Sequence, residues 1–69
     1  MVDVGSFWKS PNYLLKVVEK DSTTTTKSWL VKTADGGEWS IYHHWLKIYY
    51  ERITEEEYKK ESIKRVLKQ

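Results

Sequence analysis

The chain contains no cysteine, so its 69 residues must hold a fold without covalent crosslinks. Neither a disulfide nor a thiolate zinc site can form, and stability must come from side-chain packing. A chain of this length builds one hydrophobic core, which supplies only about 3–5 kcal/mol. Ten aromatic residues are available for that core: four tryptophans, five tyrosines and one phenylalanine. We therefore expect residues 1–69 to form a single small domain.

The charges are nearly balanced, because 12 Lys and Arg residues face 10 Asp and Glu residues for a net charge of +2. This balance permits nucleic-acid binding without requiring it, and it excludes an acidic mimic of DNA. No apolar run approaches the roughly 18–20 residues of a membrane span. The first dozen residues carry Asp3 and lack the apolar core of a signal peptide. We expect a cytoplasmic protein with no membrane partner.

Three segments have the alternating apolar pattern and β-branched content of strands: residues 13–20, 28–33 and 38–42. Between the last two strands, Asp35 is followed by Gly36 and Gly37, and such a sequence favours a tight hairpin. The polar residues 21–26 are expected to form a loop. Residues 1–6 are expected to be a loose N-terminal arm, followed by the pair Phe7 and Trp8, one of which closes the end of the core.

The segment 43–52 fits two structures. As a helix, it places Trp45, Ile48 and Tyr49 in one stripe. As a strand, its aromatic and β-branched residues 48–52 are favourable. We expect a short turn at residues 43–46 and then a fourth short strand, while the sequence leaves helix or strand open for residues 44–50.

The C-terminal segment 54–68 has the sequence of a helix. Thr54 and Glu57 form a capping box, and Ile53 and Tyr58 are placed to form a hydrophobic staple. Acidic residues follow the cap and basic residues occupy the last turns, which complements the helix dipole. Favourable pairs at spacing i,i+4 include Glu55 with Lys59, Glu56 with Lys60, and Glu61 with Arg65.

The span from Trp29 to Tyr49 resembles the distal half of an SH3-like small barrel. In that fold a strand, a glycine turn, an aromatic strand, one helical turn and a last short strand follow in order. Here these parts are residues 29–33, 35–37, 39–42, 43–46 and 47–50. The acidic loop and ligand-binding aromatic motif of signalling SH3 domains are missing, so a polyproline ligand is not implied. We expect an α+β fold in which a small antiparallel sheet of three to four strands, within residues 13–52 and SH3-like in form, packs against one C-terminal helix.

Motifs for catalysis are missing from the sequence. Gly36 and Gly37 are the only glycine cluster and fit a hairpin, there is no cysteine nucleophile, and nothing marks a serine as activated. The adjacent His43 and His44 diverge on a helix or strand and do not chelate one ion together. We therefore expect a non-enzyme with no metal and no cofactor, in which both histidines are structural or superficial.

The aromatic residues exceed what a core of this size needs, and five of the ten lie between Trp39 and Tyr50. Exposed Trp and Tyr beside basic residues suit base stacking or a protein–protein hot spot. The candidate residues are Trp45, Lys47, Tyr49, Tyr50 and Arg52, with Lys32 and Trp29 as possible neighbours on one sheet face. The alternative is that these aromatic residues are simply buried under the helix.

A second basic feature is the row formed by Lys60, Lys64 and Lys68, which follow one another at i+4 spacing. Such a row fits a phosphate backbone, and the alternative is an ordinary solvated helix face. The sequence therefore predicts a non-catalytic binding module, first as a nucleic-acid-binding accessory protein that contacts DNA or RNA. The alternative is a protein-interaction module or small inhibitor, monomeric or homodimeric. In size and composition the chain is similar to small accessory proteins of phages and mobile elements.

Overall fold

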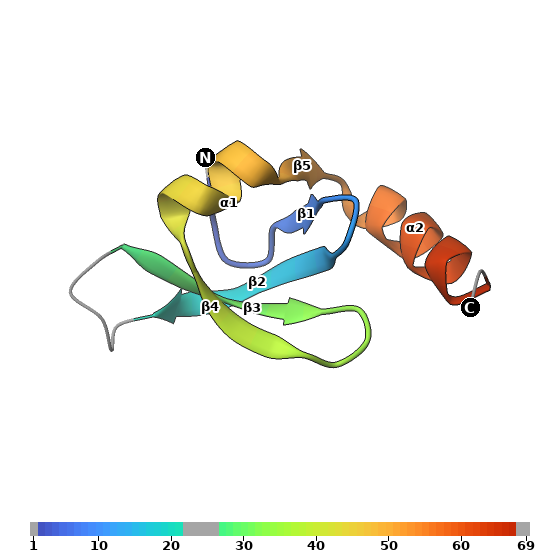
Figure 1. The fold of residues 1–69 in the computed structure, drawn as a ribbon, viewed down its shortest axis with the longest axis horizontal. Helices are drawn as coiled ribbons and strands as arrows, with labels where there is room; N and C mark the ends of the chain where they lie inside the picture. The colour runs from blue at the N-terminus through green and yellow to red at the C-terminus, as the bar shows by residue number, and fades with distance from the viewer. Residues whose placement is uncertain (1, 22–26, 68–69) are drawn as a thin grey trace.

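A computed structural model describes residues 2–21 and 27–67 of the chain, and it shows an α+β fold (Figure 1). An antiparallel sheet with the strand order β4-β3-β2-β1-β5 is accompanied by two helices within the described residues. The elements are β1 (Phe7–Lys9), β2 (Leu14–Asp21), β3 (Ser28–Thr33), β4 (Glu38–Tyr42), α1 (His43–Tyr49), β5 (Glu51–Ile53) and α2 (Glu55–Leu67). Neither helix in this part of the chain is long and apolar enough to cross a membrane.

The sheet has five strands among the described residues, so the prediction of three to four strands was too low. The missed strand is β1, which lies between β2 and β5 and pairs Trp8 with Leu15 on one side and with Arg52 on the other. A strand of three residues is too short to show an alternating pattern. Its two tertiary neighbours, rather than its own sequence, define it.

The hairpin between β3 and β4 forms where the glycines predicted it. The N–H of Gly36 donates to the carbonyl of Thr33 at 3.2 Å, and the N–H of Thr33 donates to the carbonyl of Gly37 at 2.7 Å. Gly36 has a φ of 98°, in the left-handed region that glycine adopts without steric cost. This is the three-residue hairpin loop in which a left-handed glycine follows a type I turn.

The N-terminal segment is held against the sheet, contrary to the expected loose arm at residues 1–6. Val2 is buried, and the N–H of Gly5 donates to the carbonyl of Val17 at 2.8 Å. The N–H of Val17 in turn donates to the carbonyl of Ser6 at 3.0 Å. The hydroxyl of Ser6 accepts the indole N–H of Trp8 at 2.9 Å, so this buried tryptophan has its polar atom satisfied.

The segment 43–52 is mainly helical, which is one of the two alternatives that the sequence left open; the expected short turn is a longer helix, and the fourth strand begins later than expected. Helix α1 runs through Tyr49, and β5 begins only at Glu51. The helix inserts Leu46, which is fully buried, into the core beside Leu15, Val17 and Val31. Burial of this side chain outweighs the strand preference of the neighbouring residues, because local propensity is a small term beside core packing.

Helix α2 matches the sequence prediction in its bounds and its cap. The N–H of Glu57 donates to the hydroxyl of Thr54 at 3.2 Å, as a capping box requires. The predicted pairs of Glu55 with Lys59 and of Glu61 with Arg65 form at 3.2 Å and 3.4 Å.

The packing of α2 differs from the expected cover of the sheet. The ring of Tyr58 lies 4.7 Å from the ring of Phe7 in β1, but Ile63 further along is 61% exposed. Figure 1 shows α2 extending beyond the end of the sheet. Helix α2 therefore contacts the sheet through Tyr58 but does not cover the core.

Replacement of Leu46 tests the role of α1 in the core. Leu46→Ala should lower the free energy of unfolding by about 2–5 kcal/mol, because it removes a fully buried side chain. Ile48→Ala, on the exposed side of the same helix, is the matched control and should change stability by less than about 0.5 kcal/mol. Urea denaturation measures both. Equal losses in the two variants would show that Leu46 does not anchor the helix.

Candidate functional site

Helix α1 has one buried residue and a largely exposed outer face. Leu46 points into the core, whereas Trp45, Ile48 and Tyr49 are 56%, 58% and 66% exposed. At about 100° per residue, helical spacing puts Ile48 opposite Leu46 and Trp45 on the flank of α1, and Tyr49, three residues after Leu46, is nearer its side of the helix but is exposed as well. The alternative of simple burial therefore fails for Trp45 and Tyr49, whereas Trp29 is buried and Tyr50 is half-buried against the core.

Three rings pack edge to face along this outer side. Tyr42 and Trp45 have ring centroids 6.0 Å apart at an interplanar angle of 73°, and Trp45 and Tyr49 lie 6.0 Å apart at 79°. Trp45 and Tyr49 are four residues apart and so lie on one face of α1, and Tyr42, the extended residue just before the helix, joins them at its start. Edge-to-face packing is favourable for aromatic pairs and orders the rings without burying them. We call Tyr42, Trp45 and Tyr49 the aromatic cluster.

A groove of about 560 Å³ runs between β4 and α1, along the aromatic cluster. Residues of β4 form one wall, and α1 with Tyr50 forms the other. Among the described residues, the lining of this aromatic groove is uncharged and consists of Trp39, Ser40, Ile41, Tyr42, Trp45, Tyr49 and Tyr50. Trp39 and Ile41 also pack against the core, and partial burial raises the pKa of the Tyr50 hydroxyl despite a hydrogen bond with Ser10. The groove is an apolar surface built on the core.

The groove continues into a basic hollow at the start of α1. Tyr42 and Trp45 line this second hollow of about 310 Å³ together with Lys27, His43 and His44. The indole N–H of buried Trp29 donates to Nδ1 of His43 at 3.1 Å, which fixes the imidazole. Desolvation lowers the pKa of His43, and the positive charges of Lys27 and Lys47, with His44, lower it further. This end of the groove is therefore cationic.

The structure divides the predicted basic and aromatic site residues. Trp45 and Tyr49 lie together in the aromatic cluster, Tyr50 lines the groove beside them, and Lys47 is exposed on α1. Arg52 forms an ion pair with Asp3 at 2.8 Å, away from that lining.

Three further expectations about charged and aromatic neighbours have a different outcome. Trp29 is buried on the core side of β3, whereas Lys32 is exposed and has the opposite parity along the strand, so the two do not share a face. Lys60 and Lys64 are exposed on α2 and line neither hollow of the groove, and Lys68 lies outside the described residues. Among the described residues the groove thus contains no lysine of this row, and the contact of the row with a phosphate backbone stays a prediction.

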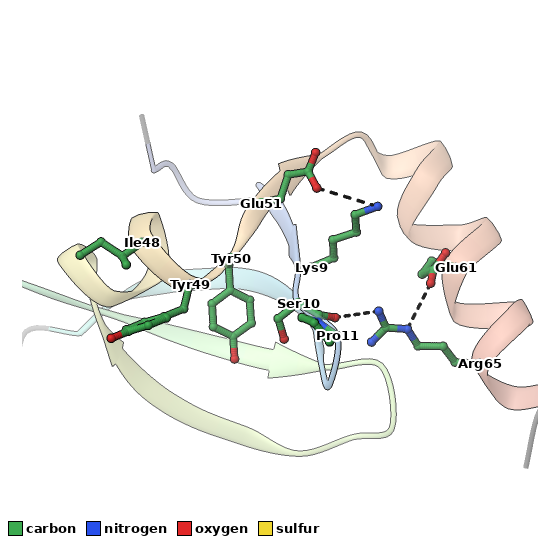
Figure 2. Close-up of a pocket in the computed structure, with 9 residues that line it drawn as sticks. All are labelled: Lys9, Ser10, Pro11, Ile48, Tyr49, Tyr50, Glu51, Glu61 and Arg65. Carbon is green, nitrogen blue, oxygen red and sulfur yellow. Dashed lines mark hydrogen bonds and ion pairs between the residues drawn. The ribbon is translucent and has the colours of Figure 1, made fainter.

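A third hollow, of about 490 Å³, lies between α1, the turn after β1, and α2 (Figure 2). Its charged side chains pair with one another or with the backbone. Lys9 lies 4.0 Å from Glu51, and Arg65 contacts Glu61 at 3.4 Å while donating to the carbonyl of Ser10 at 2.8 Å. Figure 2 shows Lys9 paired with Glu51 between β1 and β5, and Arg65 of α2 reaching Ser10 in the turn after β1. We interpret this hollow as the attachment of α2.

Several groove residues were not singled out from the sequence. Trp39, Ile41 and Tyr42 were assigned only to a strand, and Lys27 was assigned to no site. The spacing of Tyr42 three residues before Trp45 was a usable signal, but only once α1 is known to be a helix.

Among the described residues, no group of three or more potential metal ligands occurs.

Comparison with known proteins found no matching family model, no matching curated protein and no matching solved structure. The functional argument therefore rests on the aromatic groove and its basic end.

The contact between Trp29 and His43 predicts a pH dependence of stability. The indole donates to Nδ1 only while that nitrogen is unprotonated, and the pKa of His43 in the folded state is lowered. The unfolded chain therefore binds a proton more readily, so this contribution is present above the ordinary value of 6.5 and is lost as the pH falls through the folded pKa.

Urea denaturation at pH 7 and pH 5 measures the effect. The His43→Gln variant should lose less stability between these pH values than the unmodified protein does. His44→Gln, which alters the exposed neighbouring histidine, should behave like the unmodified protein. The interpretation is wrong if the three proteins lose the same stability.

Proposed function

We propose that the chain is a small non-catalytic module that binds a partner protein through the aromatic groove. The observation that carries the proposal is the exposure of Trp45, Ile48 and Tyr49 on a single short helix beside an uncharged groove. Soluble proteins rarely expose a contiguous apolar surface without using it. Trp and Tyr are also the residue types most enriched in protein–protein hot spots.

The construction of the site supports binding rather than fold stability as the reason for these exposed rings. Two tryptophans, Trp8 and Trp29, are buried and have hydrogen-bond partners for their indole N–H groups. Leu46 already anchors α1 in the core. The aromatic cluster is therefore not needed to hold the helix in place, and its rings remain available to a partner.

A single-stranded nucleic acid is the second candidate ligand. It is supported by the basic hollow, where Lys27 and His44 adjoin Trp45, since bases stack on aromatic rings while lysines contact phosphates. We regard it as less favoured because the main groove is lined without a cation and Arg52 is engaged by Asp3.

Cytoplasmic location and a phage-type accessory role remain proposals from the sequence.

We also propose that the fold is an SH3-like small barrel. The strand order β4-β3-β2-β1-β5, with a helix between β4 and β5, supports this assignment. In that arrangement α1 occupies the place of the short helical turn of the small barrel. The aromatic groove then lies between the edge strand β4 and this helix.

The partner-binding proposal predicts that the outer face of α1 is needed for capture of a partner but not for folding. Affinity-tagged Trp45→Ser/Tyr49→Ser should recover at least tenfold less of a stoichiometric partner from a cell extract than the unmodified protein. Its melting temperature should remain within a few degrees, because both side chains are exposed. Ile63→Ser, which alters a comparably exposed residue on α2, is the control and should capture normally.

A parallel measurement separates the two candidate ligands. Fluorescence anisotropy with 20-nucleotide DNA and RNA strands at 50 and 200 mM salt should show no binding. Binding that weakens steeply with salt and is lost in the double variant would instead establish the nucleic-acid function. Unchanged protein capture by the double variant would contradict the proposal.

A further inference from the structure

Strand β4 is an edge of the sheet, and one side of its backbone has no strand beside it. The hydrogen bonds from Thr33 to Gly37 and from His43 to Lys27 bracket its ladder with β3. In an antiparallel ladder every second residue directs its N–H and C=O groups toward the partner strand. On β4 these are the residues an even number of positions from Gly37 and His43. The intervening Glu38 and Ser40 therefore direct their N–H and C=O groups toward the open edge. Within the described residues, no hydrogen bond engages these outer groups.

The two edges of the sheet differ in how they are protected. The other edge, β5, is only three residues long and includes the charged pair Glu51 and Arg52. Short length and charge are common means of preventing edge pairing. Strand β4 has five residues, with a single charge at its first position and no proline or lysine. It is the edge that remains competent to accept another strand.

The aromatic groove lies directly beside this open edge. Its lining includes Ser40 and Tyr42 of β4 on one side and Trp45 and Tyr49 of α1 on the other. A strand added to β4 would therefore place its backbone against Ser40 and alternate side chains against the aromatic rings. Strand addition of this kind combines affinity from main-chain hydrogen bonds with specificity from side-chain pockets.

The charges at the two ends of β4 give an added strand a direction. Glu38 stands at the first residue of β4, close in sequence to Asp35, whereas the other end meets the basic hollow formed by Lys27, His43 and His44. Neighbouring strands of this sheet are antiparallel throughout the described residues. A strand that continues this pattern begins beside the basic hollow, so its first residues should be acidic.

We propose that the occupant of the aromatic groove is an extended peptide segment of a partner protein that pairs antiparallel with β4. Its N-terminal end carries an acidic side chain that lies beside Lys27, and its apolar side chains at alternate positions enter the groove. This inference rests on the proposed partner-binding function and specifies the class of ligand. It goes beyond that function because it requires main-chain pairing with β4.

The N–H of Ser40 provides a selective test. Ser40→Pro removes this outward N–H while leaving the hydrogen bonds to β3, and proline is tolerated at an edge with its nitrogen facing solvent. Ser40→Ala is the matched control, because both variants lose the exposed hydroxyl contact with Asp21 but the alanine keeps the N–H. Circular dichroism establishes that each variant is folded.

The probe is a phage-displayed library of random twelve-residue peptides, selected on the unmodified protein. Enriched sequences should have apolar residues at alternate positions after one or two acidic residues. For the best synthetic peptide, measured by calorimetry, Ser40→Pro should weaken binding at least tenfold and Ser40→Ala less than twofold. Lys27→Glu/Lys47→Glu should reverse the charge preference, so that the same peptide beginning with lysines binds more tightly. This charge reversal keeps the proposal falsifiable if Ser40→Pro does not fold.

Other results overturn the proposal. Peptides with apolar residues at i, i+3 and i+4 that bind Ser40→Pro normally but not Trp45→Ser/Tyr49→Ser would leave the proposed function standing and exclude strand addition. Peptides insensitive to both changes would contradict the function as well. A 16–17 kDa species in sedimentation, about twice the mass of one chain and lost in Ser40→Pro, would identify a second copy as the occupant. Failure to enrich any peptide would also exclude the proposal.

Discussion

The insertion of Leu46 into the core determines how the rest of this small domain is arranged. One fully buried side chain anchors α1 over the core face formed by β2 and β3. The geometry of a helix then places Ile48 opposite Leu46 and Trp45 on the flank of α1, and Tyr49 beside Trp45 is exposed as well. Because the chain has no disulfide to fix this segment, α1 is held against the sheet by this packing and by the hydrogen bonds of His43 with Trp29 and Lys27. The surface available for binding is thus a consequence of the core contact.

Local signals were sufficient for the parts of the fold that depend on neighbouring residues in sequence. The hairpin around Gly36 and the capped helix after Thr54 were predicted because their turn and cap residues have specific backbone requirements. Strand β1 was not predicted, and helix α1 was one of two alternatives that the sequence left open. Trp8 is a strand residue because it pairs with β2 and β5. Leu46 is buried because it packs against core residues of other elements, which the sequence of its own segment does not reveal.

The candidate site could be predicted only in part for the same reason. Trp45 and Tyr49 were identified from residue type, and the structure brings them together through helical spacing. Trp29 was expected to be a neighbour of Lys32 on one sheet face. It is instead buried with its indole N–H bonded to His43, a partner that the sequence does not reveal. The lysine row on α2 was plausible as a pattern, but charge spacing along one helix says nothing about whether another element lies beside it. The edge of β4 became visible only from the order of the strands.

The central claim is that the chain uses its tryptophans in two ways, with Trp8 and Trp29 in the core and Trp45 at a binding surface. Solvent exchange of the indole N–H protons, measured by NMR on the folded protein, tests this division most directly. The account predicts slow exchange for Trp8 and Trp29, whose N–H groups are hydrogen-bonded, and fast exchange for Trp45. Equally slow exchange at Trp45 would place its ring inside the fold and contradict the account.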